Sequence, residues 1–242
     1  VYFGVLTDTN TPVCIKVSRD KSINSFEKEF ELLAKLKGKP SIIQTHGYHS
    51  DGSIRFIVLE KGDGALEQLL NIPRYSLGLH RNILNDLMRD LAKALTVLFE
   101  MKIAHRDIKP MNIIYFIKKQ VKNSLCDQYS FKLCDFGDGR SVQSMDCAYD
   151  TVGRTYHYMA PQALARREGF RGPRISLNAE ISDLWSLGIT LYRCVTGTFP
   201  FDTTPFDPKV FLKILDGRTN NRVISHHGGK YSTKLNAMIH PR

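Results

Sequence analysis

Short apolar runs separated by turn residues open the chain and predict a small β-sheet. Residues 1–6 and 13–17 are apolar and rich in residues that favour strands, and turn-forming residues lie between the two runs. Two further strands are predicted, one from Ile42 onward and one over 54–59, with an Asp-Gly turn signal between them. The first quarter of the chain is therefore expected to be mainly strand.

A helical periodicity interrupts these strands between residues 24 and 36. Apolar residues recur there at steps of three and four, which places them on one face of an amphipathic helix; they are Phe26, Phe30, Leu33 and Leu36. Asn24, followed three residues later by Glu27, is a variant of the capping box that begins many helices. The sheet is thus expected to carry one helix.

Longer apolar periodicities dominate the rest of the chain and predict a mainly helical region. A helix is expected to start within 65–70, and leucines in register predict a buried helix over 81–101; they are Leu84, Leu87, Leu91, Leu95 and Leu98. Residues 113–134 read as a β-hairpin with an extended polar tip. A helix that is apolar nearly all round is predicted over 181–195 and a last one over 208–215. Strands followed by helices indicate the α+β class.

The composition fits a folded globular chain. Of the 242 residues, 42% are hydrophobic and 24% are charged, which argues against a disordered chain. The net charge of +10 would suit a nucleic-acid partner, but the basic residues are scattered and show no aromatic-interleaved basic motif. We therefore expect no nucleic-acid partner, and no apolar run is long enough to predict a membrane span.

The cysteines indicate a reducing compartment. There are five, an odd number, and no pair has C-x-x-C spacing, which argues against a disulfide framework or a zinc site. They are Cys14, Cys126, Cys134, Cys147 and Cys194. We expect a cytoplasmic location, with Cys134 acting as a small buried residue.

Two polar motifs in the middle of the chain carry the candidate chemistry. Residues 105–112 read H-R-D-I-K-P-M-N, and residues 135–137 read D-F-G. An ordinary polar loop with a stray carboxylate is not expected to match seven specified residues in order. The pattern resembles H-R-D-x-x-x-x-N followed by D-F-G, the catalytic-loop and metal-binding signature of protein kinases.

Other stretches extend this resemblance over nearly the whole chain. The strand ending at Lys16 resembles the V-A-I-K strand of kinases, with Cys14 in place of alanine. Glu29 lies four residues before Leu33, as in the Glu-x-x-x-Leu of the kinase αC helix; Glu27 and Glu31 are its rivals and are expected to face solvent.

Residues 158–162, Y-M-A-P-Q, resemble an A-P-E ending with glutamine replacing glutamate, which puts one structural ion pair in doubt. The D-L-W-S-L-G of residues 183–188 resembles the kinase αF signature, in which Asp183 would hold the catalytic-loop backbone.

The resemblance implies a two-lobed kinase fold, with a small antiparallel sheet lobe carrying one helix and a larger, mainly helical lobe. Residues 1–60 would form the first lobe without its glycine-rich loop, 61–64 the hinge, and 65–242 a second lobe without its last helices. The abrupt start at Val1 and the short tail lead us to expect a partial domain with weak activity and marginal stability.

The resemblance also implies roles for individual residues in transferring the γ-phosphoryl group of ATP. Asp107 would accept the hydroxyl proton, Lys109 would stabilise the transferring oxygens, and Asn112 and Asp135 would hold Mg²⁺. Lys16, held by Glu29, would bind the α- and β-phosphates. The remaining nucleotide contacts would be Val1, Cys14 and Ile114 around adenine, Leu59 as gatekeeper, and the backbone of Glu60 and Gly62.

Substrate type and regulation follow from the same resemblance. Lys109, two residues after Asp107, and Thr155, three before Tyr158, are typical of serine/threonine kinases. Arg106 beside Asp107 suggests activation by a phosphate, for which Thr151 is the first candidate. Weaker candidates are Ser141, Ser144 and Tyr149. An activating kinase or a second copy acting in trans would supply that phosphate.

A narrower resemblance is to the inhibitor-of-kappaB-kinase-related, TANK-binding-kinase-like group. The stretches that carry it are 28–33, 105–113, 183–192, 196–201 and 211–218. It implies a cytoplasmic kinase of innate-immune signalling that phosphorylates protein substrates. The main alternative is a pseudokinase scaffold of the same fold, which the presence of Lys16, Glu29, Asp107, Asn112 and Asp135 disfavours. A small-molecule kinase would lack the segment ending in A-P-x.

Overall fold

A four-stranded antiparallel sheet forms the first part of the chain. In the computed structural model, which describes residues 1–18, 23–50, 54–118, 128–142, 156–167 and 178–201, the strand order is β1-β2-β4-β3. The strands are β1 (Tyr2–Val5), β2 (Pro12–Ser18), β3 (Thr45–Ser50) and β4 (Arg55–Glu60). Lys16 of β2 lies opposite Ile57 of β4, so the strand that carries the candidate lysine is internal to the sheet.

The predicted third strand begins in the wrong place. It starts at Thr45, whereas Ile42 forms an isolated parallel bridge with Leu133, far along the chain. The N–H of Ile43 donates to the carbonyl of Leu133 at 2.9 Å, and the N–H of Leu133 donates to the carbonyl of Ser41 at 2.9 Å. Ile42 and Ile43 are therefore apolar because they are buried against a second sheet, and not because they begin β3.

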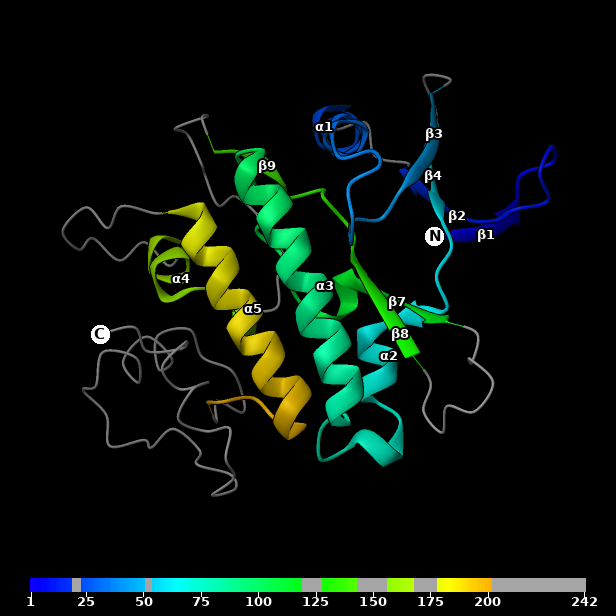
Figure 1. Cartoon of the computed structure of the whole chain (residues 1–242). Helices are drawn as coiled ribbons and strands as arrows, with labels where there is room; N and C mark the ends of the chain where they lie inside the picture. Colours follow the sequence, from blue (N-terminus) through cyan, green and yellow to red (C-terminus); the bar gives the residue numbers. More distant parts are fainter. Residues whose placement is uncertain (19–22, 51–53, 119–127, 143–155, 168–177, 202–242) are drawn as a thin grey trace.

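The helix α1 (Ile23–Lys35) lies beside this sheet and agrees with the predicted helix to within one residue at each end (Figure 1). Its buried face includes Phe26, Leu32 and Leu33. The ring of Phe30 stacks on Tyr48 of β3 with 4.9 Å between ring centroids, which attaches the helix to the sheet.

The second part is mainly helical, as predicted. Figure 1 shows α3 (Arg81–Glu100) and α5 (Ala179–Thr196) running side by side, with the shorter α2 (Leu66–Leu70) and α4 (Pro161–Arg167) beside them. On α3, Leu87, Leu91 and Leu98 of the predicted stripe are fully buried. The other two leucines of the stripe are half-buried, and Ile83, Ala94 and Val97 complete the buried face.

The ends of α5 are defined by residues that its sequence supplies. The side chain of Asn178 accepts hydrogen bonds from the N–H groups of Glu180 and Ile181, at 2.9 and 3.1 Å, which caps the first turn. Gly197 ends the helix in the left-handed conformation (φ 74°), and a Cβ there would collide with the carbonyl of Ser76. A side chain is therefore excluded at this position.

The predicted hairpin is confirmed as β7 (Ile113–Lys118) and β8 (Gln128–Leu133), with β5 (Gly64–Ala65) pairing to β7. Two acidic side chains of α3 hold β8. Asp90 accepts from the N–H of Phe131 at 3.0 Å, and Asp86 accepts from the N–H of Tyr129 at 3.2 Å. A two-stranded pair, β6 (Ile103–Ala104) with β9 (Arg140–Ser141), flanks the motif at residues 105–112.

Several predictions lie outside the described residues: the hairpin tip, the turn at 51–52, the helix over 208–215, and the hydroxyls of Ser144, Tyr149, Thr151 and Thr155. Within the described ranges, no helix is both long and apolar enough to cross a membrane. The cysteines in those ranges, Cys14, Cys134 and Cys194, are free thiols.

Candidate active site

A cleft of about 550 Å³ lies between the four-stranded sheet and the helical part, within the size range of small-molecule sites. Nine of the residues singled out from the sequence line it: Val1, Cys14, Lys16, Glu29, Glu60, Gly62, Asn112, Ile114 and Asp135. The predicted gatekeeper Leu59 lines it too. The lining also includes Phe3, Gln68 and Met111, which were not predicted as site residues, because Phe3 and Gln68 belong to no motif and Met111 fills an unspecified position of the motif at 105–112.

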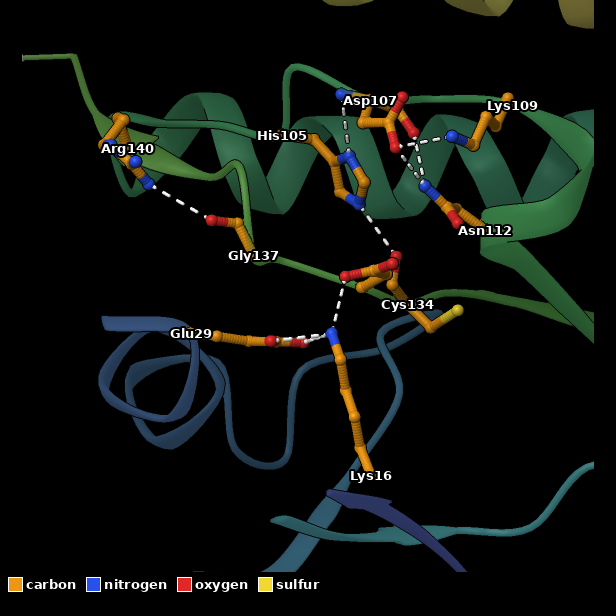
Figure 2. A network of polar contacts seen from close by, with 10 residues as sticks. Lys16, Glu29, His105, Asp107, Lys109, Asn112, Cys134, Gly137 and Arg140 are labelled. Atoms are coloured by element: carbon orange, nitrogen blue, oxygen red, sulfur yellow. Dashed lines mark hydrogen bonds and ion pairs between the residues drawn. The ribbon is translucent and has the colours of Figure 1, made fainter. Parts of the chain in front are cut away.

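Lys16 joins the two parts of the molecule across this cleft (Figure 2). Its Nζ lies 2.7 Å from both carboxylate oxygens of Glu29 on α1. The same Nζ lies 2.8 Å from Oδ1 of Asp135, which follows β8. The choice of Glu29 over its rivals as the ion-pair partner is therefore confirmed, and its side chain is only 2% exposed.

The charges of Lys16 and Asp135 stabilise each other. Burial alone would lower the pKa of Lys16, but the carboxylates of Glu29 and Asp135 outweigh it and raise that pKa to about 12. For Asp135, burial would raise the pKa, but the charge and hydrogen bond of Lys16 outweigh it and the pKa is lowered. For Glu29, burial dominates and the pKa is raised. Lys16 and Asp135 are therefore both charged at neutral pH.

A second polar group lies in the loop at residues 105–112 (Figure 2). Lys109 Nζ is 2.8 Å from Asp107 Oδ2, and Asn112 Nδ2 donates to the carbonyl and to Oδ2 of Asp107, at 2.8 Å each. Because both partners of Nδ2 are acceptors, the amide orientation is determined and the oxygen of Asn112 is left for a cation. The loop thus brings together a carboxylate, a cation and an amide.

Helix α5 holds the backbone of this loop, as predicted for Asp183. The two oxygens of its buried carboxylate accept from the N–H groups of His105 and Arg106, at 2.7 Å each. Arg106 has φ 70° and Asp135 has φ 63°, conformations that side chains rarely adopt. Such backbone strain costs about 1–3 kcal/mol per residue and concentrates at functional sites.

His105 connects the two motifs. Its Nδ1 accepts from the N–H of Asp107 at 3.2 Å, so Nε2 carries the proton and donates to the carbonyl of Cys134 at 2.9 Å. The imidazole also packs edge-on against Phe136, with 4.7 Å between ring centroids. The histidine therefore sets the spacing between Asp107 and Asp135.

The connection after β4 is shaped by a glycine and an ion pair. A Cβ on Gly62 would collide with Cγ2 of Ile114 and lie 3.0 Å from the carbonyl of Tyr115, so only glycine fits. The N–H of Glu60 already donates to the carbonyl of Gln44 at 2.9 Å, so a ligand contact by its backbone would use its carbonyl. The Glu60 carboxylate binds Lys132 Nζ at 2.6 and 2.7 Å, a pairing the sequence did not suggest.

Two oxygen donors suitable for Mg²⁺ line the cleft. The carboxylate of Asp135 and the amide oxygen of Asn112 are the hard ligands that this ion prefers, and both residues line the cleft. The residues present therefore fit a magnesium ion that retains waters and binds a phosphate-bearing ligand.

This fold and site define a protein kinase domain, and the comparison with known families agrees. The protein kinase domain family matches residues 1–236, so the chain belongs to it. The chain is 31% identical over 239 residues to the inhibitor of nuclear factor kappa-B kinase epsilon subunit homolog 1 of Caenorhabditis elegans, a match covering 91% of this chain and 29% of that protein. The expected resemblance to the inhibitor-of-kappaB-kinase-related group is confirmed by this similarity.

Kinases of another group are similar as well. Ribosomal protein S6 kinase alpha-2 of Homo sapiens is 28% identical over 201 residues, covering 82% of this chain and 25% of that protein. The putative ribosomal protein S6 kinase alpha-2 of C. elegans is 30% identical over 198 residues, covering 77% and 24%. The chain thus spans between about a quarter and three tenths of the length of these curated relatives.

Proposed function

We propose that this chain is the catalytic domain of a protein serine/threonine kinase that transfers the γ-phosphoryl group of ATP to serine or threonine hydroxyls of proteins. The observation that carries the proposal is the ion-pair chain from Glu29 through Lys16 to Asp135. Within it, the Lys16–Glu29 pair is the one that protein kinases need for catalysis, and the contact with Asp135 joins the sheet part to the helical part across the cleft. The names of the similar kinases support the same reaction.

Phosphoryl transfer needs positioning and charge stabilisation more than covalent chemistry. Mg²⁺ held by Asn112 and Asp135 would neutralise charge on the phosphates. Lys16 binds the α- and β-phosphates, and Glu29 keeps its ammonium group in place. Because Lys16 is charged at neutral pH, it needs no proton transfer before binding.

At the acceptor end, Asp107 orients the hydroxyl and receives its proton. Lys109, 2.8 Å from that carboxylate, is placed to stabilise the oxygens of the transferring group. Asn112 donates to the same carboxylate oxygen that Lys109 contacts, so the base is oriented before the substrate binds. Val1, Cys14 and Ile114 form the apolar walls around adenine, and the backbone of Glu60 and Gly62 faces its edge.

The cellular role proposed here rests on similarity alone. The relative named as a kinase epsilon subunit homolog favours cytoplasmic signalling, including the innate-immune role expected for that group. Protein substrates and an activating kinase, or a second copy acting in trans, are the partners that follow. Thr151 stays our first candidate for the activating phosphorylation.

A transfer assay with radiolabelled ATP, Mg²⁺ and a degenerate serine/threonine peptide array tests the function. Asp107→Asn should lower the rate by about a thousandfold, which corresponds to about 4 kcal/mol of lost transition-state stabilisation. Asp8→Asn, at an exposed turn, is the matched control and should behave as wild type. A wild-type rate equal to that of Asp107→Asn would reject the enzyme and favour the pseudokinase scaffold.

A further inference from the structure

Glu60, the last residue of β4, binds two other segments of the chain. Its carboxylate oxygens lie 2.6 and 2.7 Å from Nζ of Lys132 on β8. Its Oε1 also accepts from the N–H of Gln44 at 2.7 Å, and its own N–H donates to the carbonyl of Gln44 at 2.9 Å. We call these three residues the Glu60 junction. It joins the sheet part to the helical part directly before residues 61–64.

The side chain of Gln44 holds the loop between α1 and β3. Its Oε1 accepts from the N–H of Gly38 at 2.6 Å, and its Nε2 donates to the carbonyls of Ile42 and Lys39, at 2.8 and 3.3 Å. The oxygen of the amide thus accepts and its nitrogen donates, which uses both ends of the side chain. Gln44 therefore fixes its own loop through its side chain and fixes Glu60 through its backbone.

The same loop binds β8 at the residue after Lys132. The N–H of Leu133 donates to the carbonyl of Ser41, and the N–H of Ile43 donates to the carbonyl of Leu133, both at 2.9 Å. Asp135 follows Leu133 by two residues. The loop and Glu60 therefore hold neighbouring residues of the strand that leads to the proposed metal ligand.

The connection after Glu60 is fixed to the helical part from Asp63 onward. The N–H of Asp63 donates to the carbonyl of Tyr115 at 3.0 Å, and its carboxylate accepts from the N–H of Ile117 at 2.7 Å, so Asp63 is bound to β7 through its backbone and its side chain. Glu60, by contrast, still belongs to β4 of the sheet part. A rotation of one part relative to the other is therefore concentrated between Glu60 and Asp63, next to the Glu60 junction.

The Glu60 junction also borders the cleft. Glu60 and Gly62 line it, and Glu60 is one of the two residues whose backbone is proposed to face the edge of adenine. Contacts to the carboxylate and to the N–H of Glu60 restrict both its side chain and its backbone. The junction therefore fixes the edge of the base site and resists opening of the cleft at the same time.

We propose that the Glu60 junction sets how long a nucleotide stays bound in the cleft, with Gln44 as a positioning residue that acts through Glu60. An intact junction keeps the two parts closed around the nucleotide. Without it the sheet part rotates away more readily and the nucleotide leaves sooner. The inference rests on the proposed kinase function, since it takes ATP and ADP as the ligands, and it adds the residues that control release of ADP.

The dissociation rate of a fluorescent nucleotide tests the proposal. N-methylanthraniloyl-ADP bound with Mg²⁺ to the full chain is displaced by excess ADP in a stopped-flow instrument. Gln44→Ala, Glu60→Gln and Lys132→Met should each raise the dissociation rate about fivefold, because opening of the cleft limits release. Lys132→Arg keeps the charge and should stay within about twofold of wild type. Asn82→Ala, which removes an exposed amide on α3, is the matched control for Gln44→Ala.

The rate of phosphoryl transfer in a single turnover should change less than about twofold in the same variants, because the junction touches none of the transferring groups. In the double variant Gln44→Ala/Lys132→Met the effect should be smaller than the product of the two single effects, since both changes loosen Glu60. Unchanged dissociation rates with only a lower melting temperature would show a purely structural role and overturn the proposal. So would single-turnover rates that fall as much as the dissociation rates rise.

Nucleotide release is measured without transfer, which separates this proposal from the proposed function. A wild type that binds the fluorescent ADP but transfers no phosphoryl group would contradict the kinase function alone. The dissociation rates would then still decide the role of the junction, supported by a fivefold rise in the variants and overturned by unchanged rates. A wild type that binds no nucleotide would overturn both proposals.

Discussion

At the scale of single residues, the cleft depends on one cation shared by two carboxylates. Lys16 contacts Glu29 and Asp135 at 2.7 and 2.8 Å, and the glutamate is almost completely buried. A buried carboxylate without its partner is costly, because desolvation is no longer compensated. This single contact therefore affects both stability and the proposed phosphate binding.

Replacing Lys16 by Met keeps the length of the side chain and removes its charge. We expect kcat/KM to fall at least about a hundredfold, since more than 2.7 kcal/mol of transition-state stabilisation is lost. Steady-state kinetics against ATP measures this. Lys93→Met, on the exposed side of α3, should keep wild-type kinetics. Similar losses of kcat/KM in both variants would mean that the ammonium group of Lys16 has no specific role in the site.

A pH effect is expected at His157. Burial, with a smaller contribution from Arg193, lowers its pKa below the ordinary value of 6.5. The unfolded chain then binds more protons, so the stabilisation present above pH 6.5 is lost as the pH falls through the lower folded pKa. The melting temperature of wild type should drop more between pH 7.5 and 5 than that of His157→Gln. Equal drops would contradict this assignment.

At the scale of elements, strand β8 is the part that delivers Asp135. It pairs with β7 on one side, and on the other side its N–H groups donate to Asp90 and Asp86 of α3. A further bridge ties Leu133 to residues 41–43. The position of Asp135, the proposed metal ligand, is therefore set by three neighbours of one strand.

Asp90→Leu should destabilise the protein by about 1–3 kcal/mol, because the N–H of Phe131 loses its acceptor inside the structure. Asp90→Asn keeps an acceptor and should cost less. Urea unfolding followed by circular dichroism measures both. The opposite order, or no difference from wild type, would show that this bond does not hold β8.

The ion pair between Glu60 and Lys132 connects the end of β4 to β8. Both side chains are about a quarter exposed or less, and Glu60 also accepts from the N–H of Gln44 at 2.7 Å. We expect Glu60→Gln and Lys132→Met to raise KM for ATP a few-fold. Without the ion pair, Glu60 no longer fixes the position at which the connection 61–64 begins. A double-mutant cycle should show coupling of about 1 kcal/mol. Additive effects would reject the coupling.

At the scale of the whole molecule, the site exists only where the two parts meet. Lys16 and Glu29 come from the sheet part, and Asp107, Asn112 and Asp135 from the helical part. A ligand that contacts both parts binds the folded state only, so it stabilises the protein by mass action. This offers a test of the site that needs no substrate.

ATP with Mg²⁺ at a hundred times its dissociation constant should add about 2.7 kcal/mol of stability. For a chain of this size that corresponds to a rise of about 5–10 °C in melting temperature. Chelation of Mg²⁺ by EDTA should abolish most of the rise, and Asp135→Asn should reduce it. An equal rise in EDTA would contradict the proposed metal ligands.

Many features were predictable from the sequence because they are local. The helix of α1, the hairpin around β7 and β8, and the motifs at 105–112 and 135–137 follow from periodicity and short spacing. The role of Asp183 was predictable because the six residues 183–188 resemble the kinase αF signature. These features need no knowledge of how distant segments pack.

The sequence by itself determined the chemical set of the site, namely Lys16, Asp107, Asn112 and Asp135, since each belongs to a short motif. Only the tertiary structure decided which distant side chains meet. Glu67 and Arg193 lie 126 positions apart, and Glu60 and Lys132 lie 72 apart. Ile42 forms a parallel bridge with Leu133 of β8, in the other part of the chain. Such contacts depend on how helices and sheets pack, and no periodicity along the chain records that packing.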